Sequence, residues 1–315
     1  SMVFQTPILL NRTIYENLLY VIKQKNIKDK YYVDKIIKKL NNHFMQDAIF
    51  GDFDNDGENE IIILSSLGPD AYYSGWNVSL IELDKREIKS VSKVYEEVSD
   101  ASDWNWFPYM SACDLKNDND LDLFVGERLI SDSYGVSGSG VLLINDGKGS
   151  FKDVTIDSAP DLMDIGMITD AIFIDIDNDG DEDLIVVGEF MGVNIFYNQN
   201  GSFNLASTNL SKYKGWWQTI NSGDFNGDGL PDLVVGNHGL NSRFSASDDY
   251  PIRLYVNDFD GNDQLEPILT FKSRDGEFYP YDLRHNLIDQ MKPLKKVFPD
   301  YKSFKSATVK DMFSD

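Results

Sequence analysis

Short runs of apolar, mostly β-branched residues recur through the middle of the chain, each beside an acidic phrase. Residues 61–64, 184–187 and 233–235 are examples. Runs of three or four such residues bounded by turn-forming residues are typical of buried β-strands rather than of helices. The pattern therefore predicts a domain built mainly from short strands between residues 47 and 271.

The acidic phrase reads Asp-x-Asp-x-Asp-Gly-x-x-Asp, and its five copies begin at Asp52, Asp114, Asp175, Asp224 and Asp258. Oxygen ligands at positions 1, 3 and 5, with a glycine at position 6 that permits a sharp turn, can wrap a cation of calcium size. Position 7 would add its backbone carbonyl and position 9 a closing carboxylate. An EF-hand is excluded because position 12 is apolar and the flanking segments are predicted strands.

Four copies carry the complete set of oxygen ligands, and the third and fourth match the phrase best. The predicted calcium ligands are Asp52, Asp54, Asp56, Glu58, Glu60, Asp175, Asp177, Asp179, Asp181, Asp183, Asp224, Asn226, Asp228, Leu230, Asp232, Asp258, Asp260, Asn262, Gln264 and Glu266.

The second copy departs from the phrase. Lys116 stands at ligand position 3 and Asn119 replaces the glycine. An ammonium group there would repel calcium and would itself neutralise the neighbouring carboxylates. The sequence therefore predicts that this copy holds no metal, and that three to four structural calcium ions bind elsewhere.

A hairpin signal follows some copies, as in Asn145-Asp146-Gly147 and, more faintly, in Asn198 to Gly201. Asparagine and glycine between apolar runs favour tight turns with positive backbone angles. Each unit is thus expected to be a small antiparallel sheet. Such sheets, recurring without βαβ alternation, are typical of the blades of an all-β propeller.

These loops resemble the FG-GAP or VCBS repeat, the calcium-loop blade of integrin α-subunit propellers. Further stretches between residues 166 and 301, including Trp216-Trp217 and the run from Asn237 to Arg243, resemble bacterial relatives of cartilage acidic protein. The resemblance covers about residues 47–311 and implies a calcium-binding β-propeller with seven blades. Five repeats are fewer than seven, so either the chain is part of a larger ring or its ends complete blades without the phrase.

Both ends of the chain have helical rather than strand periodicity. Apolar residues fall three and four apart between Ile14 and Leu40, and again from Leu283 to Leu294. We therefore expect an N-terminal helical segment at residues 1–46, repeat blades at residues 47–271 and a C-terminal helical segment at residues 272–315.

The formal net charge is −23, which argues against nucleic acid or an anionic membrane as a partner. No apolar run is long enough to cross a bilayer. Four divalent cations would reduce the net charge to −15, so calcium is expected to stabilise the fold. Loops of this kind suit calcium at extracellular concentrations, which predicts an extracellular, cell-surface or periplasmic protein.

No nucleophile elbow, phosphate loop or zinc-ligand set is present in the sequence. The residues most suited to a ligand are Trp216, Trp217, His238, Asn241 and Arg243, which combine flat rings with polar groups. We therefore expect a non-enzymatic binding or adhesion module for a protein or glycan. Two alternatives remain open: a polysaccharide lyase that uses tyrosine, histidine and arginine, and a scaffold subunit of a cell-surface complex.

Overall fold

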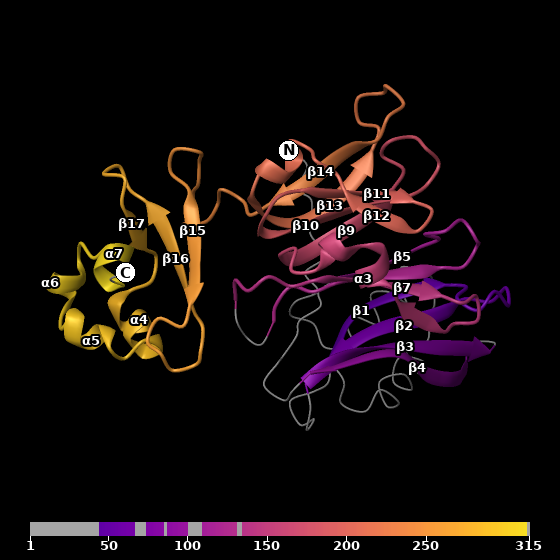
Figure 1. Ribbon diagram of the computed structural model, residues 1–315, viewed down its shortest axis with the longest axis horizontal. Helices are drawn as coiled ribbons and strands as arrows, with labels where there is room; N and C mark the ends of the chain where they lie inside the picture. The colour runs from indigo at the N-terminus through magenta and orange to yellow at the C-terminus, as the bar shows by residue number, and fades with distance from the viewer. Residues whose placement is uncertain (1–43, 67–73, 85–86, 100–108, 131–133, 314–315) are drawn as a thin grey trace.

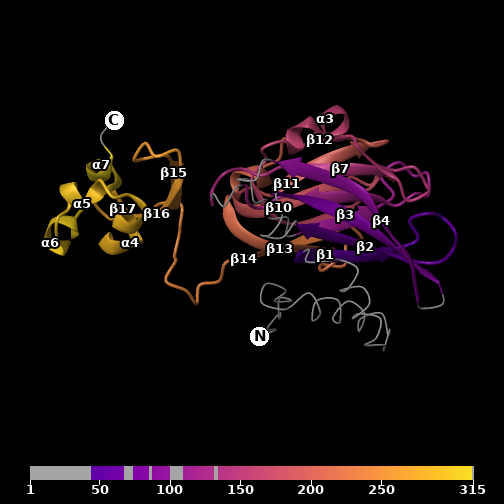
Figure 2. The same cartoon turned by 90° about the horizontal axis from the view of Figure 1, so that it is seen from below.

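The computed structural model describes residues 44–66, 74–84, 87–99, 109–130 and 134–313. These residues form four antiparallel sheets and several short helices. Strands β1 to β14 make up a larger lobe, and β15 to β17 with the last helices make up a smaller one (Figures 1 and 2). The sheets resemble propeller blades, although the described residues do not close a ring. The predicted N-terminal helix lies outside the described residues.

The first two sheets are four-stranded, with their strands in sequence order. Sheet 1 contains β1 (Phe44–Gly51), β2 (Glu60–Ser66), β3 (Ser74–Asp84) and β4 (Glu87–Ser99). Sheet 2 contains β5 (Tyr109–Cys113), β6 (Asp122–Gly126), β7 (Gly140–Asn145) and β8 (Phe151–Asp153). The β7–β8 turn has Gly147 and Gly149 at φ of 71° and 75°, as its Asn-Asp-Gly sequence predicts.

Sheet 3 has six strands because a two-stranded hairpin joins a four-stranded unit. After α3 (Thr155–Ser158) come β9 (Met167–Ile174), β10 (Asp183–Met191), β11 (Asn194–Gln199), β12 (Ser202–Leu205), β13 (Gly215–Gly223) and β14 (Asp232–Asn237). β13 pairs with the end of β10 through Glu189 and Trp216, and β14 pairs with β13. The β13–β14 hairpin thus has fewer strands than the unit before it.

Sheet 4 belongs to the smaller lobe and contains β15 (Ile252–Asn257), β16 (Glu266–Lys272) and β17 (Phe278–Pro280). It is followed by α4 (Arg284–Gln290), α5 (Leu294–Val297), α6 (Tyr301–Phe304) and α7 (Val309–Met312). Ile268 of β16 packs with Leu287, Met291 and Phe298. The last helices therefore supply the core that covers this sheet.

In the larger lobe, apolar side chains of each sheet pack on the next. Trp76 and Ile62 of sheet 1 contact the cluster that contains Leu123 of sheet 2. Phe124 of sheet 2 packs in turn with Phe196 of sheet 3. Because β6 and β7 are covered on both sides, every residue in them is buried, which explains their unbroken apolar runs.

Asp47 and Asp170 occupy equivalent positions in the first strands of their units. Each accepts hydrogen bonds from the first strand of the following unit. Asp47 in β1 accepts the backbone N–H of Met110 in β5 at 2.9 Å. Asp170 in β9 accepts the N–H of Ile220 in β13 at 2.9 Å and the hydroxyl of Thr219 at 2.7 Å. Burial raises the pKa of Asp47 to about 7, although the backbone N–H groups of Met110 and Ala48, which donate to its carboxylate, oppose the shift. Asp47 therefore bridges sheets 1 and 2, and its ionised form is destabilised because the carboxylate is removed from water.

We expect the stabilisation that Asp47 provides to fall as the pH rises from 5 to 8. The folded state holds the proton of Asp47 up to about pH 7, whereas the unfolded chain releases it near pH 4, so ionisation opposes folding in this window. The unfolding free energy of the wild type relative to Asp47→Asn should decrease by about 2 kcal/mol over this range. Urea unfolding at both pH values measures it, with the exposed Asp157→Asn as the control. Equal differences at pH 5 and pH 8 would contradict the assignment.

Candidate metal centres and aromatic surface

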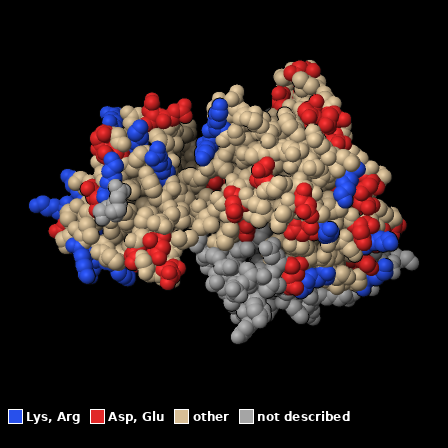
Figure 3. Space-filling view, in the orientation of Figure 1, with Lys and Arg blue, Asp and Glu red and all other residues tan. Residues whose placement is uncertain are grey.

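The five acidic phrases form five loops with one backbone conformation. We call residues 52–60, 114–122, 175–183, 224–232 and 258–266 loops 1 to 5; each connects two antiparallel strands. Loops 1 to 3 project from the right side of the larger lobe in Figure 1 and loop 4 from its top, and Figure 3 shows acidic side chains along the right side and at the top. Positions 4 and 6 have positive φ in every loop, at Asn55, Gly57, Asn117, Asn119, Asn178, Gly180, Gly227, Gly229, Gly261 and Asp263. Asparagine, aspartate and glycine tolerate this region best, so Asn119 and Asp263 serve in place of glycine.

Carboxylates hold each loop in this conformation. In loop 3, Asp175 at position 1 accepts the N–H groups of Asp179 and Gly180, each at 3.1 Å. Asp183 at position 9 accepts the N–H of Ile176 at 3.0 Å. The same bonds form in loop 5, where Asp258 accepts from Asn262 and Asp263. Each loop is thus folded around its own acids, including loop 2.

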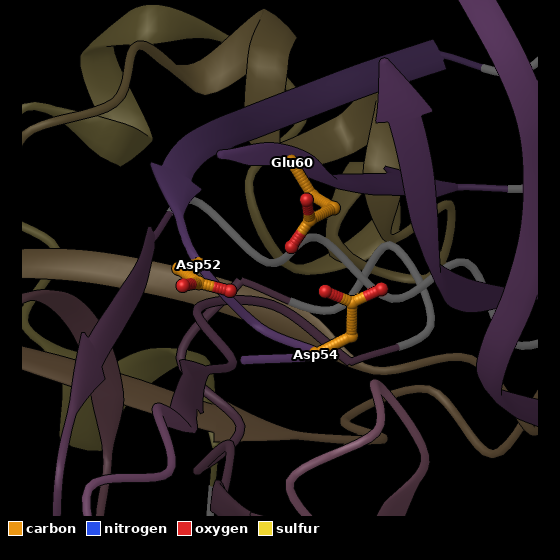
Figure 4. A group of neighbouring side chains, drawn as sticks. All are labelled: Asp52, Asp54 and Glu60. Atoms are coloured by element: carbon orange, nitrogen blue, oxygen red, sulfur yellow. The ribbon is translucent and has the colours of Figure 1, made fainter. Parts of the chain in front are cut away.

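Three loops bring three carboxylates to one point. The acids at positions 1, 3 and 9 place one oxygen each within 4.8 Å of the others. The groups are Asp52, Asp54 and Glu60 in loop 1, Asp175, Asp177 and Asp183 in loop 3, and Asp258, Asp260 and Glu266 in loop 5. Figure 4 shows the three carboxylates of loop 1 directed toward one another.

These groups fit a hard divalent cation. Oδ1 of Asp52 and Oδ1 of Asp260 are buried and have no hydrogen-bond partner. A buried carboxylate oxygen without a donor is costly unless a cation binds it. An all-oxygen set from carboxylates suits calcium. Loops 1, 3 and 5 could therefore each hold one ion.

The cluster acids repel one another in the absence of a cation. Burial raises the pKa of Glu60; the N–H of Phe53 lowers it, and the charges of Asp54 and Asp56 raise it. Burial also raises the pKa of Asp183, where Asp177 and Asp179 add to the shift. A divalent cation would reverse this tendency by favouring the charged forms.

The predicted ligands at positions 5 and 7 have a different arrangement from those at positions 1, 3 and 9. The side chain at position 5 accepts a hydrogen bond from the backbone N–H at position 7. In loop 3 the N–H of Asp181 donates to Asp179 at 3.0 Å, and in loop 5 the N–H of Gln264 donates to Asn262 at 2.8 Å. Glu58 and Leu230 make the same bond in loops 1 and 4. One oxygen of each position 5 side chain is therefore engaged within its loop.

Loop 4 lies outside the set of three groups. The amide nitrogen of Asn226 donates to Asp228 at 3.1 Å and to Asp232 at 3.4 Å. Asn226 occupies position 3, where loops 1, 3 and 5 have aspartate. In loop 4 the amide N–H groups of Asn226 therefore interact with the carboxylates of Asp228 and Asp232. In loops 1, 3 and 5 a bound cation would neutralise the corresponding carboxylates.

Lys116 in loop 2 extends toward the next unit. A side chain at Gly201 would meet Cγ of Lys116 at 3.1 Å, so the lysine stem lies over the β11–β12 turn. Burial raises the pKa of Asp122 to about 6, and the charge of Lys116 opposes that rise. The lysine thus supplies positive charge to loop 2, although no ion pair of Lys116 is formed among the described residues.

Asparagines join neighbouring loops, a role that the repeat pattern in the sequence does not predict. Nδ2 of Asn55 donates to Asp120 at 2.6 Å, and Nδ2 of Asn117 donates to Asp181 at 2.7 Å. Nδ2 of Asn198, at the end of β11, donates to the carbonyls of Leu115 at 3.0 Å and Glu182 at 3.1 Å. The signal available in the sequence was the recurrence of asparagine at loop position 4 and before each hairpin turn.

Part of the predicted ligand surface forms an aromatic patch, which we define as Phe190, Trp216, His238, Phe244 and Tyr281. The Trp216 ring centroid lies 4.8 Å from that of His238, 5.2 Å from that of Phe244 and 5.4 Å from that of Phe190. Tyr281 follows β17 and lies 5.0 Å from Phe244. The patch therefore connects the end of β13 with the smaller lobe.

The other predicted residues differ in position. Arg243 is exposed and lies 4.9 Å from the Phe244 ring centroid. Asn241 is exposed near Gly239. Trp217 is partly buried and packs against the apolar cluster that contains Ile220 and Val187, so it lies on the core-facing side of the sheet. Successive strand residues point to opposite faces, which separates Trp217 from Trp216.

A buried polar network supports the patch. Glu189 is 4% exposed and accepts from Arg128 and from the Tyr134 hydroxyl, each at 2.6 Å. The indole N–H of Trp216 donates to the Tyr134 oxygen at 3.0 Å. Phe190 has a φ of 57° at an irregularity in the β10 pairing, next to Glu189. The indole of Trp216 is therefore fixed by its hydrogen bond to Tyr134, which is itself bonded to the Glu189 carboxylate of the ion pair with Arg128.

Comparison with known proteins supports the repeat assignment. The FG-GAP-like repeat family matches residues 114–186 and 175–235, which contain loops 2, 3 and 4. FG-GAP-like repeats are therefore present, and they imply that the sheets are propeller blades. No curated protein matches the chain. Among the described residues, no helix has the length and apolar character to span a membrane.

Proposed function

We propose that this chain is an extracellular, calcium-stabilised FG-GAP β-propeller module that binds a protein or glycan and catalyses no reaction. The observation that carries the calcium assignment is the convergence of three carboxylates in each of loops 1, 3 and 5. The orphaned oxygens of Asp52 and Asp260 support it. Affinities of about 10⁻⁴ to 10⁻³ M, as in extracellular calcium modules, would keep such loops loaded outside the cell.

The loops lie between the first and second strands of their units, where a cation would act on the fold. Glu60 and Asp183 each begin a buried second strand, β2 and β10. An ion bound there would neutralise charge at the end of the core. We therefore assign calcium a structural role, with the ligand site on another surface.

The aromatic patch is our choice for the ligand surface. Trp216 is partly exposed, and His238 and Arg243 beside it are exposed. Flat rings next to polar groups can stack on a sugar or receive side chains of a protein. The ion pair of Arg128 and Glu189, which bonds to Tyr134 beneath Trp216, would keep the ring in one orientation.

Replacing Trp216 by alanine is expected to weaken ligand binding at least about fivefold, because ring stacking of this size contributes more than about 1 kcal/mol. The measurement is a screen of the wild type on arrayed polysaccharides and extracellular glycoproteins in calcium, followed by affinity measurements on each positive ligand. Tyr213→Ala is the matched control, since Tyr213 is 65% exposed and lies outside the patch.

The same screen separates the alternative functions. Equal binding by Trp216→Ala and the wild type would remove the patch as the ligand surface. Release of an unsaturated, ultraviolet-absorbing product from an acidic polysaccharide would instead favour a lyase, in which Tyr134, His238 and Arg243 are the residues to test.

A further inference from the structure

Two strands that follow one another in the chain each have an unpaired edge. β14 pairs with β13, and no described residue pairs with its other edge. β15 pairs with β16, and its second edge is likewise unpaired among the described residues. The two strands lie in different lobes (Figures 1 and 2). Each edge therefore has main-chain groups that can extend a ladder.

The preceding units show where a second and a third strand lie relative to each other. Sheets 1 and 2 have four strands in sequence order, and β9 to β12 repeat this order within sheet 3. The same order would make β14 and β15 the paired middle strands of a fourth unit, β13 to β16. In sheet 2 the connection between the middle strands is residues 127–139, and here it is residues 238–251. Connections of nearly equal length can thus return the chain for antiparallel pairing.

The third strands of sheets 2 and 3 reach their ends at an asparagine that bonds to the acid at loop position 9. The N–H of Asn145 donates to Oδ1 of Asp122 at 2.8 Å. The N–H of Asn198 donates to Oδ1 of Asp183 at 2.8 Å. β15 also ends in an asparagine, Asn257. β15 therefore has the sequence signature of a third strand.

The side chains of the first two asparagines bond to equivalent carbonyls. Nδ2 of Asn145 donates to the carbonyl of Phe53 at 2.8 Å and to that of Leu121 at 3.1 Å. These acceptors are position 2 of loop 1 and position 8 of loop 2. Nδ2 of Asn198 makes the same two bonds one unit further along the chain. One asparagine thus satisfies three acceptors in each unit.

The three acceptors that match Asn257 lack these donors. By position in loops 3 and 4 they are Oδ1 of Asp232 and the carbonyls of Ile176 and Pro231. Among the described residues, Oδ1 of Asp232 has only a 3.4 Å contact from Asn226, and no hydrogen bond reaches the two carbonyls. Asn257 is itself exposed. The donor and its acceptors are therefore both present in the chain but apart.

The two lobes are built so that one can move relative to the other. The apolar cluster around Ile268 and Leu287 contains no residue of the larger lobe among those described. The connection of residues 238–251 contains no helix or strand. β15 meets the larger lobe where Leu254 and Val256 lie against Gly135. Lobes with separate cores and a connection of this kind move as units.

We propose that this arrangement is an open form, and that the chain also adopts a closed form in which β15 pairs antiparallel with β14. Closure makes β13 to β16 a fourth unit with the strand order of the first three. Asn257 then donates its N–H to Oδ1 of Asp232 and its amide to the two carbonyls. Closure releases the contact of β15 with Gly135, and the new ladder and the three satisfied acceptors offset that loss.

The register of the closed pair follows from the units that are already paired. Ile185, two residues after the acid at loop position 9, faces Ile195, three residues before the asparagine. β6 and β7 pair with the same offsets. These offsets place Val234 opposite Leu254. Val234 is 49% exposed in the open form, and closure covers it.

Disulfide trapping in the intact protein tests the closed form. Val234→Cys combined with Leu254→Cys should form an intramolecular disulfide in a glutathione redox buffer, because closure brings the two residues opposite each other. Val234→Cys with Arg253→Cys is the matched control, since the side chain of the neighbouring residue points to the other face of β15. It should crosslink at least about tenfold more slowly. The wild type gives the background, because Cys113 is buried.

The products of this reaction decide between pairing within one chain and exchange between chains. An intramolecular disulfide in the first pair alone supports the closed form. Equal rates in the two pairs would overturn it. A disulfide-linked dimer in place of the intramolecular product would also overturn it, and would show that β15 of a second copy occupies the β14 edge.

Asn257→Ala in the Val234→Cys, Leu254→Cys protein tests the asparagine contacts separately. It should slow the crosslink about tenfold, because the amide bonds to the two carbonyls exist in the closed form. Asn204→Ala is the control, since Asn204 is an exposed asparagine of β12 that closure does not involve. Equal crosslinking rates in the two variants would contradict the role of Asn257 in closure.

Discussion

Removing divalent cations is expected to lower the unfolding temperature by more than about 15 °C. With a dissociation constant of about 10⁻⁴ M, a calcium concentration of about 10 mM is about 100-fold higher, and each site then stabilises the fold by about 2.7 kcal/mol. Three sites would contribute about 8 kcal/mol, and each kcal/mol shifts the midpoint by about 2–4 °C in a domain of this size. Differential scanning calorimetry in about 10 mM calcium and in excess chelator measures the effect, and elemental analysis counts the ions.

Variants in loops 2 and 3 assign the counted calcium ions to individual loops. Asp175→Asn removes one charge of the loop 3 group and should reduce the count from three to two. Lys116→Asp supplies the missing position 3 acid in loop 2, where Asn119 already has the required positive φ of 68°, and should raise the count by one. An unchanged melting temperature with no bound metal would show that the loops are acidic turns only.

Asn198→Ala is expected to destabilise the protein by about 3 kcal/mol, because buried carbonyls that lose their donors remain unsatisfied. The side chain donates to Leu115 O and Glu182 O and accepts the N–H of Gly201 at 2.7 Å. Alanine removes all three bonds, whereas the backbone bond to Asp183 remains. Urea unfolding in saturating calcium measures the loss without contributions from metal release.

The control for this variant is Asn204→Ala in β12. Asn204 is exposed and lies opposite Tyr197 in the same sheet, so its replacement should change stability by less than about 0.5 kcal/mol. Similar losses in both variants would mean that Asn198 acts through strand propensity and not through its contacts with the preceding loop.

The sequence predicted the strands and the acidic loops well because their signals are local. Nine consecutive residues contain the turn-forming asparagines and glycines and the carboxylates that bond to their own backbone, as Asp175 does with Gly180. The expected calcium groups in loops 1, 3 and 5 follow from the same local pattern. Loop 4 matched the phrase equally well, but its Asn226 amide faces the acids.

The hairpin asparagines have a role that the local sequence does not predict. Their positions between apolar runs predict turns, and the structure places Asn145 and Asn198 at the ends of β7 and β11, next to turns. Their contacts with Phe53 and Leu115 span 92 and 83 residues of sequence. Such pairs depend on how whole sheets stack, and the sequence pattern does not encode which carbonyl lies beside which strand end.

By itself, the sequence determined the composition of each repeat: short buried strands, oxygen-rich turns and a charge that cations would reduce. Only the tertiary structure decided that Trp216 joins the aromatic patch while Trp217 packs against a core cluster, and that no described strand pairs with the second edge of β14. The physical reason is the distance along the sequence over which each kind of interaction acts. Turn conformation depends on backbone sterics and side-chain hydrogen bonds within a few residues, whereas burial and strand pairing depend on surfaces that distant segments bring together.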